Sequence, residues 1–183
     1  MMQVNQVYTN QQYDNVVEKC RRIFLKKTKD YGTSWRVYRT ISIADQIYIK
    51  ARRIRNIQEN GVQRIDDDIP GEFKGILNYA VIGLIQLKLN DGGEREELQV
   101  DEALSLYDDQ IGKAKKLMTD KNHDYGEAWR EMSQESFVDL ILAKILRIKQ
   151  IVQNEGKTIA SEGIDANFYD ILNYAVFALI MAE

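Results

Sequence analysis

Apolar residues recur every three or four positions through most of the chain, the spacing of one face of an α-helix. The pattern predicts three helices in each half: about residues 13–29, 42–61 and 71–89, then about 104–122, 136–156 and 167–183. Ser42 and Ser136 suit the N-caps of the middle helices. The third helices are apolar nearly all round at 76–85 and 171–180, which is typical of the central helices of a bundle. We expect an all-α fold.

The two halves repeat each other in order. Residues 27–36 (KTKDYGTSWR) return as residues 121–130 (KNHDYGEAWR), and ILNYAV at 76–81 returns unchanged at 171–176. The copies are 94 residues apart up to the end of the middle helix and 95 after it. This internal duplication predicts a six-helix bundle of two homologous three-helix repeats with a pseudo-two-fold axis. The repeats would span 1–90 and 103–183, joined by an acidic, glycine-containing linker at 91–102, in one compact body.

Composition and charge narrow the class of protein. The 183 residues are 44% hydrophobic and 29% charged, and the net charge of −3 gives no electrostatic footprint for nucleic-acid binding. Cys20 is the only cysteine, and the first residues have no signal-peptide pattern. The longest apolar run, 76–89, contains polar residues and is shorter than the about 20 residues that span a bilayer. We expect a cytoplasmic monomer or homodimer with neither a membrane nor a nucleic acid as partner.

Lys50 and Lys144 lie inside the apolar stripe of the second predicted helix of each half. An unpaired ammonium in such a place is costly. In one interpretation each lysine packs its stem on the core and pairs its head with a protein carboxylate or with water. In the other, the ammonium meets the phosphate or carboxylate of a ligand. We expect each lysine to have a carboxylate within ion-pair distance, from the third helix or the loop before it, because a lysine on an apolar face with no partner should lose its charge.

Two further repeated groups have both a structural and a functional interpretation. Asn78 and Asn173 lie in the middle of the most apolar helices, so each amide must bond either a neighbouring helix or a ligand or metal. The hydroxyls of the tyrosines that follow, Tyr79 and Tyr174, have the same two interpretations. The motif Asp-Tyr-Gly-x-x-Trp-Arg could clamp its loop onto the bundle, or stack a base and hold its sugar or phosphate. Its second copy contains Asp124, Tyr125, Trp129 and Arg130.

Carboxylates recur where a divalent cation could bind. Asp45 returns as Asp139, while on the third helix Gly75 corresponds to an aspartate in the second half. Oxygen ligands on facing helices are how bundles bind Mg²⁺, whereas a solvated acidic loop is the alternative that we favour for residues 66–68. With one histidine, His123, a zinc site is not expected, and no Gly-rich phosphate loop is present. The acidic residues near the third helices are Asp66, Asp67, Asp68, Glu72, Glu162, Asp165 and Asp170.

These repeated blocks resemble the helical family called nucleotide modification associated domain. The resemblance is carried by Lys121-x-x-Asp-Tyr-Gly-x-x-Trp-Arg130, Asp139-x4-Lys-x-x-Arg-Ile148 and Asp170-Ile-Leu-Asn-Tyr-Ala175. More remotely, the layout is similar to the all-α NTP pyrophosphohydrolases (MazG-like), which hold Mg²⁺ through Glu-x-x-Glu on one helix and Glu-x-x-Asp on the next. Neither half has the full set, because those positions hold Ser42-x-x-Asp45 and Ser136-x-x-Asp139, then Glu72-x-x-Gly75 and Asn167-x-x-Asp170.

The resemblance implies a protein of nucleotide metabolism or modification that binds a nucleotide or another small phosphorylated ligand, with a Mg²⁺-dependent pyrophosphohydrolase as its enzymatic form. Asp139, Asp170 and Glu162 would hold the metal, and Lys144 and Arg147 would neutralise phosphate charge during catalysis. We expect the second repeat to be the competent one because it has an aspartate at both metal positions. The alternative is a non-catalytic structural or interaction protein whose repeated polar residues only fix the interface between repeats. The expected substrate contacts are Lys50, Asp124, Tyr125, Trp129, Arg130, Asn173 and Tyr174.

Overall fold

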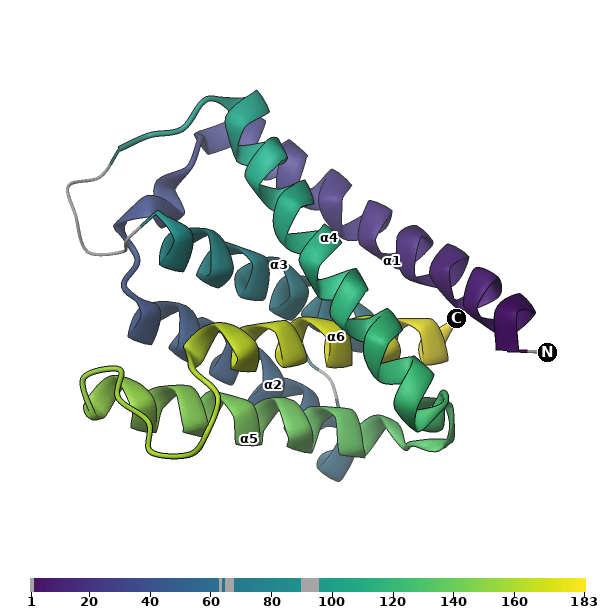
Figure 1. The fold of residues 1–183 in the computed structure, drawn as a ribbon. Helices are drawn as coiled ribbons and strands as arrows, with labels where there is room; N and C mark the ends of the chain where they lie inside the picture. The colour runs from purple at the N-terminus through teal and green to yellow at the C-terminus, as the bar shows by residue number, and fades with distance from the viewer. Residues whose placement is uncertain (1, 63, 65–67, 90–95) are drawn as a thin grey trace.

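Six α-helices in two successive sets of three make up the described part of the chain. The computed structural model describes residues 2–62, 64, 68–89 and 96–183 (Figure 1). A short 3-10 helix precedes the middle helix of each repeat, and no strand occurs among the described residues, so the predicted all-α fold of two three-helix repeats is confirmed. The helices are α1 (Met2–Tyr31), η1 (Ser34–Val37), α2 (Thr40–Asn60), α3 (Ile69–Lys88), α4 (Val100–Tyr125), η2 (Ala128–Glu131), α5 (Gln134–Gln153) and α6 (Ile164–Ala182).

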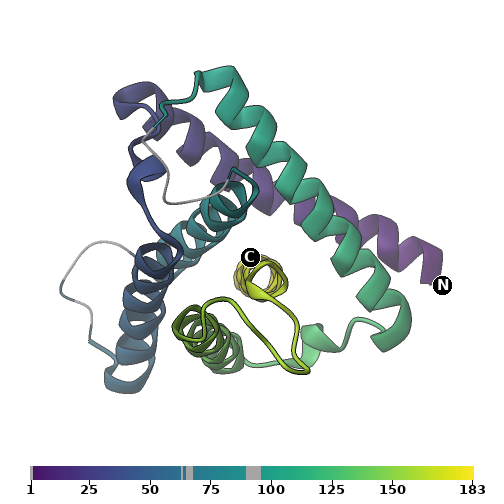
Figure 2. The ribbon, with the colours of Figure 1, turned by 60° about the vertical axis from the view of Figure 1, so that its left-hand side comes forward.

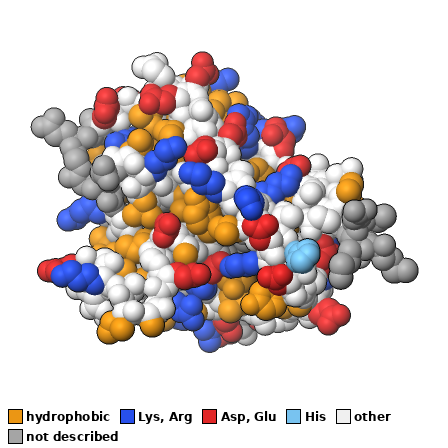
Figure 3. Space-filling model, in the orientation of Figure 1, with side chains coloured by type: hydrophobic (Ala, Val, Ile, Leu, Met, Phe, Trp, Pro, Cys, Tyr) orange, Lys and Arg blue, Asp and Glu red, His pale blue; other side chains and the backbone are white. Residues whose placement is uncertain are grey.

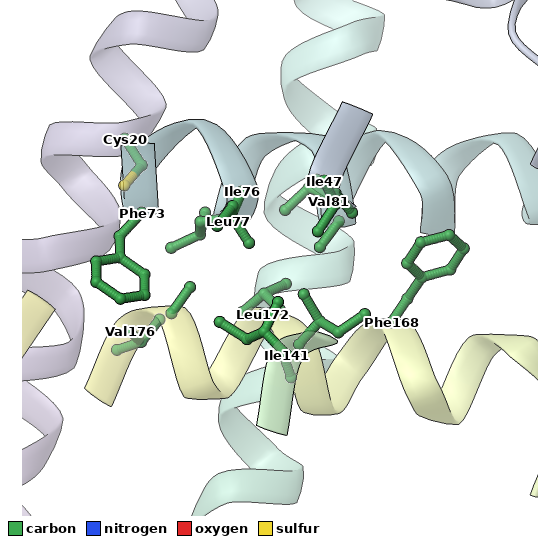
Figure 4. Close-up of a cluster of buried hydrophobic side chains, with 14 of the residues drawn as sticks. Cys20, Ile47, Phe73, Ile76, Leu77, Val81, Ile141, Phe168, Leu172 and Val176 are labelled. Carbon is green, nitrogen blue, oxygen red and sulfur yellow. The ribbon is translucent and has the colours of Figure 1, made fainter. Parts of the chain in front are cut away.

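The helices pack as three layers, and each layer contains the same helix of both repeats. α3 and α6 lie against each other in the middle, α2 and α5 cover one side, and α1 and α4 cover the other (Figures 1 and 2). Side chains of α3, among them Leu77 and Val81, point toward those of α6, among them Leu172 and Val176, and all four are buried (Figure 4). The third helices are apolar nearly all round because both of their faces are covered.

Crossed hydrogen bonds join the two repeats inside the core. The amide of Asn78 in α3 donates to the backbone carbonyl of Cys20 in α1 (3.0 Å) and accepts a hydrogen bond from the hydroxyl of Tyr107 in α4 (2.7 Å). Both asparagines therefore bond neighbouring helices, as the structural interpretation expects, and each tyrosine hydroxyl comes from the other repeat. The equivalent set in the second repeat is Asn173, Ala114 and Tyr13, with distances of 3.0 Å to the carbonyl and 2.8 Å to the hydroxyl.

The amino-terminal ends of the helices differ from the predicted ones. α1 and α4 begin at Met2 and Val100, so residues 100–102 are helical rather than linker, while residues 91–95 of the predicted linker lie outside the described residues. Ser133, not Ser136, caps α5: its hydroxyl accepts from the backbone N–H of Ser136 at 3.2 Å. α2 begins directly after Arg39, so Ser42 is not its cap either. Each middle helix starts earlier because the preceding 3-10 turn leaves the chain extended there.

Two features, the charged surface and the burial of α6, are relevant to the prediction that a membrane is not a partner. Basic and acidic side chains are interspersed on the face that Figure 3 shows, with exposed ion pairs such as Arg21–Asp108. Among the described residues, α6 is long and apolar enough to cross a membrane by length and composition, but 61% of its apolar window is buried inside the protein. Such burial is what the middle helix of a three-layer bundle requires.

Candidate functional site

Two cavities occupy equivalent places in the two repeats. Each lies among the first helix, the tryptophan-containing loop after it and the third helix of its own repeat. The first cavity has a volume of about 460 Å³ and the second about 150 Å³. Only the first falls in the range of about 300–1,000 Å³ that small-molecule sites occupy. Both are lined by the same repeated positions, which are Lys27, Tyr31, Trp35, Asn78 and Tyr79 in the first and Lys121, Tyr125, Trp129, Asn173 and Tyr174 in the second.

Differences on the third helix explain the unequal volumes. In the second repeat Phe177 stacks on Trp129, with ring centroids 4.3 Å apart and planes only 6° from parallel. The smaller Ile82 takes this position in the first repeat. Asp170 likewise lines the second cavity where the first has Gly75. The sequence pointed to the second repeat as the better binding site, but its larger side chains fill the space, and the roomier cavity belongs to the first.

The first cavity confirms that the stripe lysine finds a carboxylate. The Lys50 ammonium lies 3.4 Å from a carboxylate oxygen of Glu72 on α3, and an Arg53 nitrogen lies 2.9 Å from the other oxygen. Glu72 is buried and therefore needs these cations. This carboxylate was expected on the third helix or the loop before it. Asp66 and Asp67 of that loop lie outside the described residues, and Asp68 caps α3 through the backbone N–H of Gly71 at 2.6 Å.

Two further lysines line the first cavity without an acidic partner. In the part of the chain that the structure describes, no carboxylate lies within ion-pair distance of Lys27 or Lys74, whereas Lys50 shares Glu72 with Arg53. Asp68 and Glu72 are the acidic residues in the lining, and both are already engaged. Among the described lining residues, three lysines therefore outnumber two carboxylates, and this positive excess favours an anionic ligand.

Aromatic side chains also line the first cavity, beside the lysines. Phe24, Trp35, Tyr31, Tyr38 and Tyr79 line it, and Trp35 is held by a tilted contact with Phe24 at 6.3 Å between ring centroids. Partial burial, with some repulsion from neighbouring groups, raises the pKa of Tyr31 and Tyr79 above their usual range, so both phenols stay neutral. Flat apolar faces beside lysines suit a planar ring attached to an anion.

The second cavity holds its own anion. Lys121 and Lys144 each place an ammonium 2.7 Å from a different oxygen of Asp170, which confirms the predicted carboxylate partner of Lys144. Burial acts to raise the pKa of Asp170, but the hydrogen bonds from the two lysines outweigh it, and the pKa lies below the usual range for aspartate. Arg147 is exposed on α5. Burial and the charge of Asp170 raise the pKa of Tyr174 above its usual range, although the positive charges of Lys121 and Arg147 act to lower it.

The residues expected to hold Mg²⁺ are not brought together. Asp139 is exposed and faces Arg55 of the other repeat at 3.6 Å, and its counterpart Asp45 faces Lys149 at 2.7 Å, so the recurring aspartates form crossed ion pairs between α2 and α5. Asp170 is neutralised by two lysines, and Glu162 is exposed. Among the described residues, no three acidic, histidine or cysteine side chains group as a metal site. Carboxylates already engaged by cations do not fit the Mg²⁺ ligand set that was expected.

The Asp-Tyr-Gly-x-x-Trp-Arg loop is clamped onto the bundle in both repeats. In the first, the amide nitrogen of Gln86 on α3 donates to the carbonyls of Trp35, Arg36 and Tyr38, and its oxygen accepts from the Arg36 side chain. In the second, Arg130 bonds Glu127 at 2.7 Å and reaches α1.

The clamping interpretation therefore accounts for the tryptophans and arginines of the motif. Trp35 and Trp129 are buried, and Trp129 also donates to Asn122 at 3.2 Å. Asp124 is exposed beside His123, and Tyr125 is 78% exposed at the rim of the second cavity. Of the expected substrate contacts, Asn173 lines the second cavity and donates one hydrogen bond and accepts one within the protein, while Lys50 lines the cavity of the first repeat.

The described residues form an all-α protein made of a duplicated three-helix unit, with an equivalent cavity in each copy. The chain belongs to the family described as nucleotide modification associated domain 1, whose model matches it twice, at residues 27–87 and 121–181. Each match begins at the repeated lysine of the cavity wall and ends within or just before the last turn of the third helix. No curated protein and no solved structure shows significant similarity to the chain.

Sequence reasoning missed part of the first cavity. Lys27 could have been found, because it recurs as Lys121 in the most specific repeated segment. Lys74 has no such signal: its counterpart is Tyr169, and only the fold shows that it lines the cavity. Gly75 was interpreted as the loss of a metal ligand, whereas in the structure the end of the Lys50 side chain lies against it.

Proposed function

We propose that this protein binds a nucleotide, or another small ligand with a planar ring and a phosphate, in the cavity of the first repeat. The observation that carries the proposal is the composition of that cavity. Aromatic rings and three lysines line it, and two of these lysines have no acidic partner among the described residues. Rings favour stacking with a base, and ammonium groups favour phosphate. Membership of a nucleotide modification associated family supports the same ligand class.

Binding rather than hydrolysis is the activity that the cavity supports best. A pyrophosphohydrolase of the type first considered needs free carboxylates to hold Mg²⁺. Glu72 is occupied by Lys50 and Arg53, and the other predicted ligands lie outside the first cavity. The proposal therefore assigns no catalytic role to Lys144 or Arg147.

The alternative class, a structural or interaction protein, is favoured by a separate observation. The asparagine–tyrosine bonds and the Asp45–Lys149 and Asp139–Arg55 pairs join the two repeats, which supports this alternative. These contacts leave the lining lysines Lys27 and Lys74 unexplained, and for this reason we favour ligand binding.

The test is calorimetric titration of nucleoside mono-, di- and triphosphates into wild type, Tyr31→Ala and Tyr125→Ala proteins. The two tyrosines are equivalent and exposed, but only Tyr31 borders the larger cavity. Loss of a stacking ring costs about 1–3 kcal/mol, so we expect Tyr31→Ala to weaken binding at least about fivefold and Tyr125→Ala to leave it unchanged. Equal effects of the two variants, or no heat with any nucleotide, would overturn the proposal and favour the interaction protein.

A further inference from the structure

The two cavities share a pair of lysines but differ in what those lysines hold. In the second repeat the carboxylate of Asp170 bridges Lys121 and Lys144, at 2.7 Å from each ammonium. The equivalent lysines of the first repeat are Lys27 and Lys50, and both line the open cavity. The position equivalent to Asp170 is a glycine, Gly75. The first repeat thus retains the cations that hold an anion in the second, without the side chain that supplies it.

Glu72 does not take over the bridging role. It lies one helical turn before Gly75 and pairs with Lys50 at 3.4 Å and with Arg53 at 2.9 Å. In the described part of the chain no carboxylate is within ion-pair distance of Lys27, whereas its counterpart Lys121 is bonded to Asp170. The first cavity also carries Lys74 where the second repeat has Tyr169. Its cation excess is therefore larger than that of the second cavity.

The end of the Lys50 side chain occupies the space next to Gly75. A Cβ atom built on Gly75 would lie 2.9 Å from Cε and 3.2 Å from Nζ of Lys50, so the ammonium lies directly against the glycine backbone. Because these atoms are the far end of a flexible side chain, a small group there would displace them at low cost. An oxyanion at this point would contact Lys50 as the carboxylate of Asp170 contacts Lys144.

We infer that the first repeat contains an anion subsite over Gly75, in which a phosphate group of the ligand bridges Lys27 and Lys50 as Asp170 bridges their counterparts. The second repeat serves as an internal example of the bound state, with a carboxylate standing in for the ligand's anion. Phosphate is favoured over carboxylate because Lys74 adds a third cation. The inference rests on the proposed function and adds to it the orientation of the ligand: phosphate at Gly75, ring toward Trp35 and Tyr31.

Pyrophosphate is the probe for this subsite, and its binding is measured by thermal shift and by calorimetric titration. Gly75→Asp gives the first repeat the carboxylate of the second, and Gly75→Ala is the matched control for added bulk without charge. We expect wild type and Gly75→Ala to bind pyrophosphate within about threefold of each other, and Gly75→Asp to bind at least about thirtyfold more weakly. Equal loss in both variants would mean that only space matters and would overturn the subsite.

A second pair of variants tests the lysine. Lys27 and Lys26 are neighbouring exposed lysines of α1, but only Lys27 lines the cavity. Both Lys27→Ala and Lys26→Ala remove one positive charge, so a difference between them measures the subsite rather than net charge. We expect at least about tenfold weaker pyrophosphate binding for Lys27→Ala and no change for Lys26→Ala. The same loss in both would contradict the inference.

The two proposals fail differently. If pyrophosphate binds wild type but not Gly75→Asp, while nucleotides bind no better than pyrophosphate, the anion subsite stands and the nucleotide proposal falls. If nucleosides without phosphate bind wild type as tightly as nucleotides, the aromatic site stands and the anion subsite falls. If neither nucleotide nor pyrophosphate binds, both are overturned.

Discussion

At the scale of single residues, hydrogen bonds from two tyrosine hydroxyl groups connect the repeats. The hydroxyls of Tyr13 and Tyr107 are buried, and each satisfies the amide oxygen of an asparagine in the opposite repeat. Burial and neighbouring negative charges raise the pKa of both tyrosines well above the usual range, so they act as neutral donors at any ordinary pH. A buried acceptor that loses its donor is left with an uncompensated cost of desolvation.

Tyr107→Phe removes one such donor and leaves the ring in place. We expect it to lower the free energy of unfolding by about 1–3 kcal/mol, and Tyr13→Phe to do the same because its environment is equivalent. Tyr8→Phe is the control: Tyr8 is exposed and contacts Arg130 through its ring, so a change within about 0.5 kcal/mol is expected. Urea unfolding measures all three, and a cost confined to only one of the core tyrosines would argue against the crossed arrangement.

The residues differ in how far the sequence predicted them. Lys50 and Lys144 were recognised because a charge in an apolar stripe demands a partner, and both partners were found on the third helix. Tyr13 and Tyr107 were missed because a tyrosine in an apolar stripe looks like any core aromatic residue. Its hydroxyl partner lies on the other repeat, and sequence alone does not give the register between repeats.

Close helix contact is the main feature at the element scale. Gly83 of α3 meets Phe168 of α6, so that a Cβ atom at Gly83 would lie 2.8 Å from the ring. Gly112, in the interior of α4, has nothing within 4 Å of the same point and is exposed. One glycine is therefore needed for packing between the central helices, and the other only weakens its helix.

Alanine at these two positions should have opposite effects. We expect Gly83→Ala to destabilise the protein by about 1–3 kcal/mol, because the ring of Phe168 is itself buried and must shift. Gly112→Ala should stabilise it by about 0.5–1 kcal/mol, because alanine favours the helix and meets no neighbour. Thermal unfolding of the two variants beside wild type checks both signs. Stabilisation by Gly83→Ala would mean that α3 and α6 are less closely packed than described.

The early start of α1 shows what periodicity alone could not predict. Its first turns are polar and give no apolar stripe, yet Thr9 is fully buried. The guanidinium of Arg130, from the loop of the second repeat, donates to Thr9 at 2.8 Å and to Gln12 at 2.7 Å. The helical structure of this segment is therefore stabilised by tertiary contacts with the other repeat, and not by an amphipathic pattern of its own.

The layering of like helices leads us to expect that the whole molecule unfolds as one cooperative unit. α3 and α6 are nearly all apolar, and each covers the other, so neither repeat alone encloses its third helix. We expect fragments 1–95 and 96–183, produced separately, to be partly unfolded or self-associated, and to regain a single cooperative transition when mixed in equal amounts. Circular dichroism and size-exclusion chromatography follow this, and two independently folded monomeric fragments would contradict it.

The sequence predicted the architecture, whereas the different sizes of the two cavities follow only from the structure. Duplication, helix order and the central position of the third helices follow from patterns along the chain. Choosing between the two cavities required knowing volumes, and these depend on how Phe177 stacks on Trp129 and on how Asp170 meets two lysines. The number of aspartates at the expected metal positions favoured the second repeat. That number does not reveal that Asp170 is already paired with two lysines of the protein.

The exchange of Gly75 for Asp170 between the repeats has a consequence for how such a protein can evolve. In a symmetric homodimer one codon specifies both copies of a site, so any substitution that closes one pocket closes the other. Joining the copies in one chain gives each pocket its own codons. The cavity of one repeat can then be filled by side chains of the protein while the equivalent cavity of the other repeat stays open. The expected stoichiometry is therefore one ligand per chain.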